Sequence, residues 1–324
     1  MKVLVTGGAG YIGSHTAKAL AEAGHDPVVF DNLSTGHQWA VKWGPLVESD
    51  LADISAIRRA LKEHAIDAVI HFAASAYVGE SMNDPGKYFQ NNVVNSLNLF
   101  QAMNDVGVKK IVFSSSCATY GMPESLPIAE EHPTNPVNPY GESKLMVEKM
   151  LRWFRDIHDF KWIALRYFNA AGADPGGEIG EVHEPETHLI PLALEAAMDP
   201  SKKLMVFGTD YPTTDGSAIR DYIHVSDLAQ AHVLALESID RINNQVFNLG
   251  TGSGVSVLEI VKQVSELSGN PIEPIFSERR PGDPAVLVAD SAKVKSILRW
   301  KPVYSDISVC LKTAMAWMKK YSFN

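Results

Sequence analysis

The stretch Lys2-Val3-Leu4-Val5-Thr6-Gly7-Gly8-Ala9-Gly10-Tyr11-Ile12-Gly13 decides the fold that we expect for this chain. It begins as a short buried strand, and a helical pattern continues beyond it to about residue 23. The spacing of Gly7, Gly10 and Gly13 permits a tight turn, close approach of a pyrophosphate and packing of helix against strand. The stretch therefore predicts a dinucleotide-binding turn, with a purely structural turn as the alternative. A Walker A loop is excluded, because Ser14-His15 stands where Lys and Ser/Thr should follow.

An acidic residue follows the next expected strand, which covers residues 27–30 and ends at Asp31. A carboxylate at this distance from the glycine turn can hydrogen-bond the adenosine ribose hydroxyls, and it would repel a 2′-phosphate. The sequence therefore favours NAD over NADP as the cofactor.

Strands and helices then alternate along the chain. We expect strands at 46–48, 68–72 and 111–113 and helices at about 54–64 and 86–106. Such alternation predicts an α/β fold with a doubly wound parallel sheet of the Rossmann type. Ligands of these sheets bind at the carboxyl ends of the strands. At those ends the sequence places Asp50-Leu51, expected beside the adenine, then the small residue Ala73, and Ser116.

The segment Tyr140-Gly141-Glu142-Ser143-Lys144 is predicted to start a helix, since Asn138 can cap it and Pro139 tolerates its first turn. Tyr140 and Lys144 would then project from one face. An ammonium group beside a phenol stabilises the phenolate, and lowering a tyrosine pKa from ~10 to neutrality takes roughly 4 kcal/mol. The pair is a candidate general base for a sugar or alcohol hydroxyl, which Ser116 could also hydrogen-bond. The alternative is a surface helix with a chance Tyr/Lys pair.

Further short motifs recur along essentially the whole chain: Asp31-Asn32-Leu33, Val78-Gly79-Glu80-Ser81, Asn91-Asn92, Ser114-Ser115-Ser116, Pro139-Tyr140-Gly141, Arg166-Tyr167-Phe168-Asn169, Arg220-Asp221-Tyr222-Ile223-His224-Val225, Phe247-Asn248-Leu249-Gly250 and Arg279-Arg280-Pro281-Gly282-Asp283. On these motifs and the glycine turn, the chain resembles the extended short-chain dehydrogenases/reductases, and among them the nucleotide-sugar 4-epimerases. The resemblance implies interconversion of UDP-galactose and UDP-glucose through a 4-keto sugar, with transient hydride transfer to tightly bound NAD. In this reaction Tyr140 would be the base, Lys144 would tune it, and Ser116 would bind or relay a proton at O4.

The resemblance also implies two sets of ligand contacts. The expected NAD contacts are Gly7, Gly10, Tyr11, Ile12, Gly13, Asp31, Asn32, Asp50, Leu51, Phe72, Ala73, Asn91, Ser114, Tyr140, Lys144 and Tyr167. The expected UDP-sugar contacts are Ser116, Tyr140, Asn169, His188, Leu189, Phe207, Arg220, Arg280 and Asp283. Within the second set, the two arginines are expected on the diphosphate, Asp283 on the uridine ribose and Phe207 near the uracil. His188 departs from the family, in which Asn is often found.

Two domains are expected: an NAD-binding domain at 1–168, to which about 222–250 returns, and a smaller C-terminal α/β UDP-sugar-binding domain at 169–324. Helices are expected at 255–268 and 307–320. The segment 172–188 reads as a loop that contains Glu181, His183, Glu186 and His188. Pro185 breaks any helical face there and the spacing fits no familiar ligand pattern, so we expect a solvated loop and no metal site.

Whole-chain composition limits the remaining classes. The net charge of −9 without a Lys/Arg run argues against nucleic acid as a partner, and no apolar run approaches the ~20 residues of a membrane helix. Only two cysteines, without metal spacing, favour a reducing, cytoplasmic location. The family resemblance implies a homodimer formed through the helices near residues 88–103 and 143–157.

Three alternatives to this activity remain. A UDP-N-acetylglucosamine or UDP-pentose 4-epimerase would use the same residues, and Leu287, at the family's size-gating position, is intermediate in size. A sugar-nucleotide 4,6-dehydratase would need an Asp-Glu pair after the strand-end hydroxyl, where this chain has Cys117-Ala118. A non-catalytic NAD-binding sensor could dispense with Tyr140 and Lys144.

Overall fold

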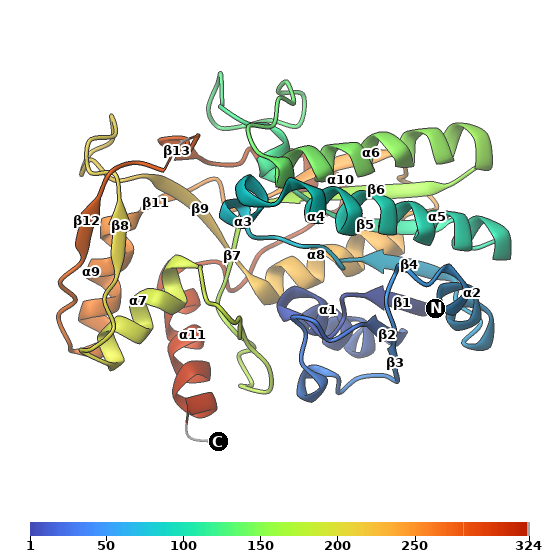
Figure 1. The fold of residues 1–324 in the computed structure, drawn as a ribbon, viewed down its shortest axis with the longest axis horizontal. Coiled ribbons are helices and arrows are strands. Elements are labelled where there is room, and N and C mark those ends of the chain that lie inside the picture. Colours follow the sequence, from blue (N-terminus) through green and yellow to red (C-terminus); the bar gives the residue numbers. More distant parts are fainter. Residues whose placement is uncertain (281, 323–324) are drawn as a thin grey trace.

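A seven-stranded sheet forms the centre of the computed structural model, which describes residues 1–280 and 282–322 (Figure 1). Pro281 of the motif quoted above lies outside these residues. The strand order is β10-β6-β5-β4-β1-β2-β3, and every neighbouring pair is parallel. The strands are β1 (Lys2–Thr6), β2 (Asp26–Asp31), β3 (Leu46–Glu48), β4 (Ala68–His71), β5 (Lys110–Ser116), β6 (Lys161–Tyr167) and β10 (Gln245–Leu249). The doubly wound parallel sheet that the sequence predicts is therefore confirmed.

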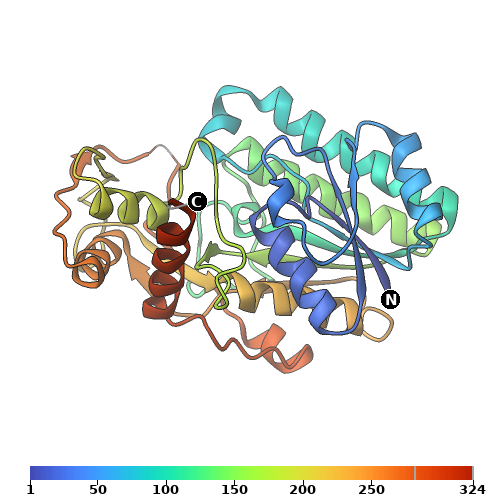
Figure 2. The same ribbon diagram turned by 90° about the horizontal axis from the view of Figure 1, so that it is seen from below.

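Helices cover both faces of this sheet, which explains why its strands are apolar without alternation. Successive side chains of β1 point to opposite faces: Leu4 joins the core beneath α2, α5 and α6, while Val3 and Val5 join the core beneath α1 and α8. Figure 2 shows the two helical layers. Their bounds are α1 (Tyr11–Glu22), α2 (Ile54–Glu63), α5 (Asn95–Val106), α6 (Pro139–His158) and α8 (Val225–Ser238).

The order of the strands reverses between β1 and β4, because the chain winds outward in both directions from this point. The glycine turn follows β1, and Phe72-Ala73 follows β4. Such a switch point opens a crevice at the carboxyl edge of a parallel sheet, where ligands bind.

The C-terminal region forms a smaller α/β layer beside that edge (Figures 1 and 2). In its main sheet β9 pairs with β7, β11 and β13, and in a second, two-stranded sheet β8 pairs with β12. These strands are β7 (Asn169–Ala171), β8 (Met205–Phe207), β9 (Ile219–His224), β11 (Gly254–Ser256), β12 (Ile275–Ser277) and β13 (Val286–Leu287). The helices are α7 (Leu189–Met198), α9 (Val257–Ser268), α10 (Ala292–Ile297) and α11 (Ile307–Ser322). After β9 the chain returns to the large sheet, which α8 covers and β10 completes.

Two expected helices differ from the structure. The helix expected over 86–106 is interrupted: α4 (Pro85–Tyr88) leads into a π-helical turn, Phe89–Val94, before α5 begins. Such wide turns re-aim side chains and are frequent at functional sites. The helix expected from residue 255 begins instead at Val257, because residues 254–256 pair with β9.

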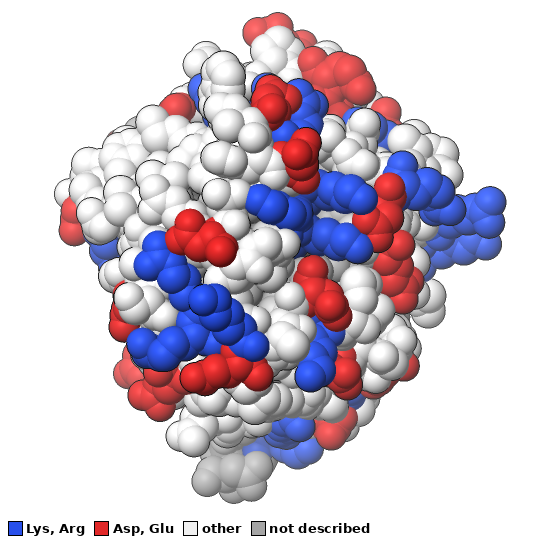
Figure 3. All heavy atoms as spheres, turned by 90° about the vertical axis from the view of Figure 1, so that its right-hand side faces the viewer, with Lys and Arg blue, Asp and Glu red and all other residues white. Residues whose placement is uncertain are grey.

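The surface is of mixed charge where Figure 3 displays it, on the right-hand side of Figure 1. Basic side chains lie there among acidic ones, and no extended basic area covers this face. Among the described residues no helix has the length and apolar character needed to cross a membrane.

Candidate functional site

The glycine turn after β1 is shaped by close backbone contacts. Gly7 has a φ of +71°, and a Cβ there would lie 2.6 Å from the backbone nitrogen of Ala73. A Cβ on Gly13 would lie 2.1 Å from the carbonyl oxygen of Gly7. At Gly10, by contrast, a Cβ would meet only that carbonyl oxygen, at 3.4 Å. Gly7 and Gly13 thus let the chain pack on itself. Gly10 leaves the start of α1 open to a ligand, and the free N–H groups of the first helical turn can bind the phosphates of that ligand.

Asp31 ends β2 beside this turn and is 8% exposed. Its carboxylate accepts hydrogen bonds from the backbone N–H groups of Ala9 and Leu33, both at 2.9 Å. Burial raises the pKa of this carboxyl, against the opposing effect of the two hydrogen bonds. The nearby Asn32 amide donates to Asp50 at 2.6 Å, so the expected adenosine contacts gather at one sheet edge. Leu51 differs, since it is buried in the core beneath this edge.

The π-helical turn aims two asparagines at the end of β4. Asn91 donates to the Ser75 hydroxyl at 3.1 Å. Asn92 accepts from the Ser75 backbone N–H at 2.8 Å and donates to the Ser75 carbonyl at 3.0 Å and the Ser143 hydroxyl at 3.0 Å. Asn92 therefore ties the segment after β4 to α6. No role was expected for Asn92, although Asn91-Asn92 is one of the motifs on which the family resemblance rests.

The Tyr140 segment starts α6 as predicted, with the Asn138 side chain accepting from the Gly141 N–H at 2.8 Å. Tyr140 is 8% exposed and Lys144 is 3% exposed. The Lys144 ammonium lies 5.9 Å from the centre of the Tyr140 ring and donates to the Ser114 carbonyl at 2.8 Å. No carboxylate pairs with Lys144 within the described chain, and burial lowers its pKa to about 7. The Lys144 amine therefore keeps hydrogen-bond donors available beside the buried Tyr140 phenol.

The phenol is held in its neutral form by the protein alone. Burial raises the pKa of Tyr140 well above its usual value, and the hydroxyl of Ser116 opposes this by hydrogen bonding. Tyr167 stands nearby at the end of β6, with its hydroxyl 2.5 Å from that of Ser114, and burial raises its pKa to about 12. Deprotonating Tyr140 therefore requires positive charge from Lys144 and from a bound ligand.

The expected nucleotide-binding residues of the C-terminal region lie in contact with one another. Arg220 in β9 forms an ion pair with Asp283. The Arg280 guanidinium lies 4.1 Å from the centre of the Phe207 ring, and its carbonyl accepts from the Asp283 N–H at 3.2 Å. The structure thus brings together two cations, an acid and an aromatic ring from three separate segments. This set can bind a diphosphate, a ribose and a base.

The other expected substrate residues lie near the start of the C-terminal region. Asn169 begins β7, and Leu189 begins α7 and packs against the C-terminal core. His188, immediately before α7, keeps 46% of its side chain exposed. Its Nδ1 lies 2.8 Å from Glu181 and 3.2 Å from Glu186.

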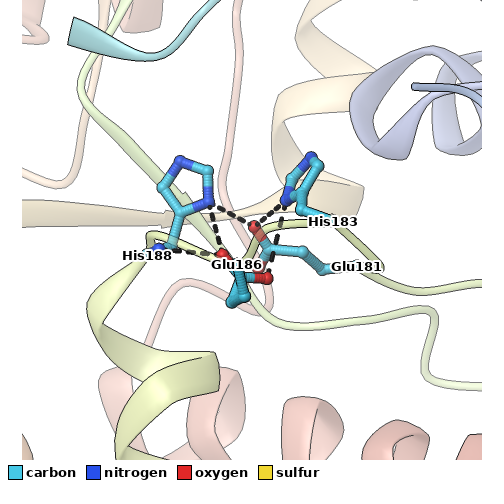
Figure 4. Close-up of side chains that lie close together, drawn as sticks. All are labelled: Glu181, His183, Glu186 and His188. Carbon is cyan, nitrogen blue, oxygen red and sulfur yellow. Dashed lines mark hydrogen bonds and ion pairs between the residues drawn. The ribbon is translucent and has the colours of Figure 1, made fainter. Parts of the chain in front are cut away.

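The expectation of a solvated loop at 172–188 is wrong for two of its acidic residues, Glu181 and Glu186, whereas Glu178 and Glu184 are exposed. The side chains of Glu181 and Glu186 are only 8% and 10% exposed. Figure 4 shows both carboxylates enclosed between His183 and His188. The spacing of the four residues could not predict this cluster. The cluster forms because the loop folds back on itself and is contacted by Tyr11, Tyr77 and Trp317, which lie elsewhere in the sequence.

Comparisons with known proteins agree with the fold and identify the family. Residues 3–250 match the model of the NAD dependent epimerase/dehydratase family. The chain is 48% identical over 322 residues to the UDP-glucose 4-epimerase of Halalkalibacterium halodurans, covering 99% of this chain and 96% of the relative. A crystal structure of UDP-glucose 4-epimerase from Brucella ovis in complex with NAD is 51% identical, with a TM-score of 0.94 and 97% of each chain covered. The Bifidobacterium longum enzyme, solved with NAD+ and UDP, is 40% identical with a TM-score of 0.94 over 99% of each chain.

Proposed function

The chain belongs to the NAD-dependent epimerase/dehydratase family, and from this membership and the geometry of its site we propose that it is a UDP-glucose 4-epimerase. It interconverts UDP-galactose and UDP-glucose through a 4-keto sugar. The observation that carries the proposal is the buried Tyr140–Lys144 pair at the carboxyl edge of the sheet, beside Ser114 and Ser116.

The site fits NAD. The turn formed with Gly7, Gly10 and Gly13 leaves the start of α1 open for the pyrophosphate. The Asp31 carboxylate can accept hydrogen bonds from the adenosine ribose hydroxyls. Lys144 retains donors for the nicotinamide ribose, since only the Ser114 carbonyl accepts from it among the described residues. NAD supplies the acceptor, and afterwards the donor, of the sugar's C4 hydride.

Tyr140 handles the proton of the sugar's 4-hydroxyl. As a phenolate it removes this proton while C4 is oxidised, and it returns the proton after the 4-keto sugar has turned its other face to the cofactor. Lys144 stabilises the phenolate, and Ser116 hydrogen-bonds the sugar O4. Net redox change over the cycle is zero, so the cofactor need not leave.

The UDP portion anchors the substrate while the sugar turns. We assign Arg220 and Arg280 to the diphosphate, Asp283 to the uridine ribose and Phe207 to the uracil, with Asn169, His188 and Leu189 beside the sugar-phosphate. Arg220 would share its guanidinium between Asp283 and phosphate. Binding energy concentrated on the nucleotide leaves the sugar free to rotate.

We infer that 1–168, together with about 222–250, is the NAD-binding domain and that the rest of 169–324 binds the UDP-sugar. The return of β10 to the large sheet supports this division. Free thiols at Cys117 and Cys310 support a reducing, cytoplasmic location.

We also infer a homodimer formed by α5 and α6. Trp153 and Ile157 lie one turn apart on α6 and are 66% and 65% exposed, and Val94 at the start of α5 is 41% exposed. Large apolar side chains on adjacent helices favour a subunit contact. Sedimentation should give twice the chain mass, and Trp153→Glu should give the mass of one chain.

The activity can be tested without added cofactor. Purified protein incubated with UDP-galactose should yield UDP-glucose by NMR, because NAD is retained. Tyr140→Phe should keep its NAD and lose turnover. Full turnover by this variant, or no reaction by the wild type even after NAD is supplied, would contradict the proposal. A parallel incubation with UDP-N-acetylgalactosamine tests the wider specificity that Leu287 leaves open.

A further inference from the structure

We propose that Glu181, His183, Glu186 and His188 bind a divalent transition-metal ion of the zinc type, as a structural site that fixes the conformation of loop 172–188 (Figure 4). This site is separate from the proton and hydride chemistry of Tyr140. It carries no step of the proposed reaction, and its occupancy can be measured whether or not the chain is an epimerase.

The spacing of the four ligand atoms suits a tetrahedral ion. One ligand atom from each residue lies within 4.8 Å of all the others. The histidine Nδ1 atoms lie 2.8, 3.2, 3.2 and 3.6 Å from the carboxylate oxygens. Zinc bonds of about 2.0–2.2 Å in tetrahedral geometry place ligands roughly 3.3–3.5 Å apart. The four nitrogen–oxygen distances therefore differ from this spacing by at most roughly 0.7 Å.

The donor set also matches this type of ion. Imidazole nitrogen and carboxylate oxygen are zinc ligands, and two carboxylates cancel the charge of a divalent cation. Burying two adjacent carboxylates without a cation is costly. The two carboxylates also give this point a negative potential, which attracts a divalent cation.

The orientation of His183 is a further argument for a metal. Its Nδ1 is buried and makes no hydrogen bond of normal geometry, although carboxylate oxygens of Glu181 and Glu186 lie 3.2 and 3.6 Å away. An unsatisfied buried nitrogen that faces two acids needs an explanation. A metal ion between the nitrogen and the oxygens provides one, because the ring then points at the ion rather than at either oxygen.

The surroundings hold the ligands in place from several parts of the fold. The Glu186 carboxylate accepts from the Thr187 and His188 N–H groups at 2.7 and 2.8 Å, and the Glu181 carbonyl accepts from the Trp317 indole at 3.1 Å. The rings of Tyr11, from the glycine turn, and Tyr77 stand edge-on to His183. A metal here would fix the conformation of the loop, which contacts Tyr11 on one side and Trp317 of α11 on another.

His188 links this site to the proposed substrate pocket. Coordination through Nδ1 leaves the ring proton on Nε2, so the exposed edge of His188 becomes a fixed hydrogen-bond donor. This consequence alone rests on the proposed function, because it assumes that His188 borders the sugar-phosphate.

Cobalt(II) provides a direct test. NAD-bound protein, treated with a chelator and dialysed, is titrated with Co2+, whose tetrahedral complexes absorb visible light strongly. We expect one Co2+ per chain, displaced by Zn2+. Saturating Zn2+ should raise the Tm by roughly 3 °C or more, since a ligand at 100 times its Kd stabilises by about 2.7 kcal/mol. His183→Gln should lose the band and the Tm shift, whereas His64→Gln, the matched control at the residue after α2, should keep both.

Folding of each variant is checked by circular dichroism and by retained NAD. Glu186→Gln, which keeps the shape of the side chain, provides a second variant if His183→Gln fails to fold. The proposal is overturned if the wild type shows no cobalt band and no zinc-dependent Tm shift. It is equally overturned if a folded ligand variant responds to metal as the wild type does. The four side chains would then be a metal-free network with protonated histidines.

Discussion

Lys144 on α6 and Arg166 on β6 are both buried cations, and they differ in what neutralises them. Arg166 donates Nε and Nη2 to the Glu148 carboxylate at 2.8 and 2.5 Å, and Glu148 also accepts from Ser115 at 2.6 Å. Among the residues that the structure describes, Lys144 has only the Ser114 carbonyl as a hydrogen-bond acceptor. Burial lowers the pKa of both side chains, but Glu148 more than compensates at Arg166, whereas no described residue compensates at Lys144. A paired buried charge serves the fold, and an unpaired one keeps its donors for a ligand.

The strongest test of this difference removes the unpaired cation. Lys144→Met should lower kcat by about 10³-fold or more, because the Tyr140 phenolate loses its nearest cation, while the Tm stays level or rises. Epimerase assays and thermal unfolding of the NAD-depleted protein measure the two effects. A large loss of Tm would mean that Lys144 stabilises the fold much as Arg166 does. This result would contradict the distinction between the paired and the unpaired cation.

Removing the acid of the paired cation should have the opposite result. Glu148→Gln leaves the Arg166 guanidinium buried without its counter-ion, which costs about 3–5 kcal/mol of unfolding free energy. Denaturant unfolding measures this loss. The fraction that remains folded should turn over UDP-galactose within a few-fold of the wild type, since Glu148 borders no expected ligand. A selective loss of kcat at unchanged stability would be the contrary outcome.

The pH dependence of stability should separate the same two cations. The Lys144 pKa is about 7 in the folded chain, against an ordinary value of 10.5. Between these values the unfolded chain binds a proton that the folded chain does not, so this group makes stability rise with pH from about 7 to 10.5. In the NAD-depleted proteins, the unfolding free energy of the wild type should therefore rise relative to that of Lys144→Met as the pH increases from about 7 to 10.5. A constant difference across this window would show that Lys144 is charged in the folded protein.

A half-buried cation should give the smallest effect. Arg220 is already paired with Asp283, and we expect it to keep that pairing while it binds phosphate. Arg220→Lys loses the planar, bidentate geometry and should raise KM for UDP-galactose roughly 10-fold, with kcat and Tm little changed. Steady-state kinetics at fixed ionic strength measure this. An unchanged KM would remove Arg220 from the proposed diphosphate site.

Much of the fold could be predicted from local patterns. The glycine turn, the strand–helix alternation and the capped start of α6 each depend on residues close together in the chain, where spacing decides geometry. The interruption of the helix at 89–94 could not be predicted in this way. Asn92 makes its hydrogen bonds to Ser75 and Ser143, which lie far from it in sequence, and the wider turn follows from those contacts.

The sequence by itself determined the parallel sheet, the glycine turn and the placement of Tyr140 and Lys144 on one helix face, because periodicity and turn chemistry act over a few residues. The tertiary structure alone decided which charges are paired. Arg166 meets Glu148 from the neighbouring strand, Lys144 meets no acid among the described residues, and the loop brings Glu181 and Glu186 against two histidines. Burial and pairing are properties of the folded surroundings, and they set the pKa values on which the chemistry depends.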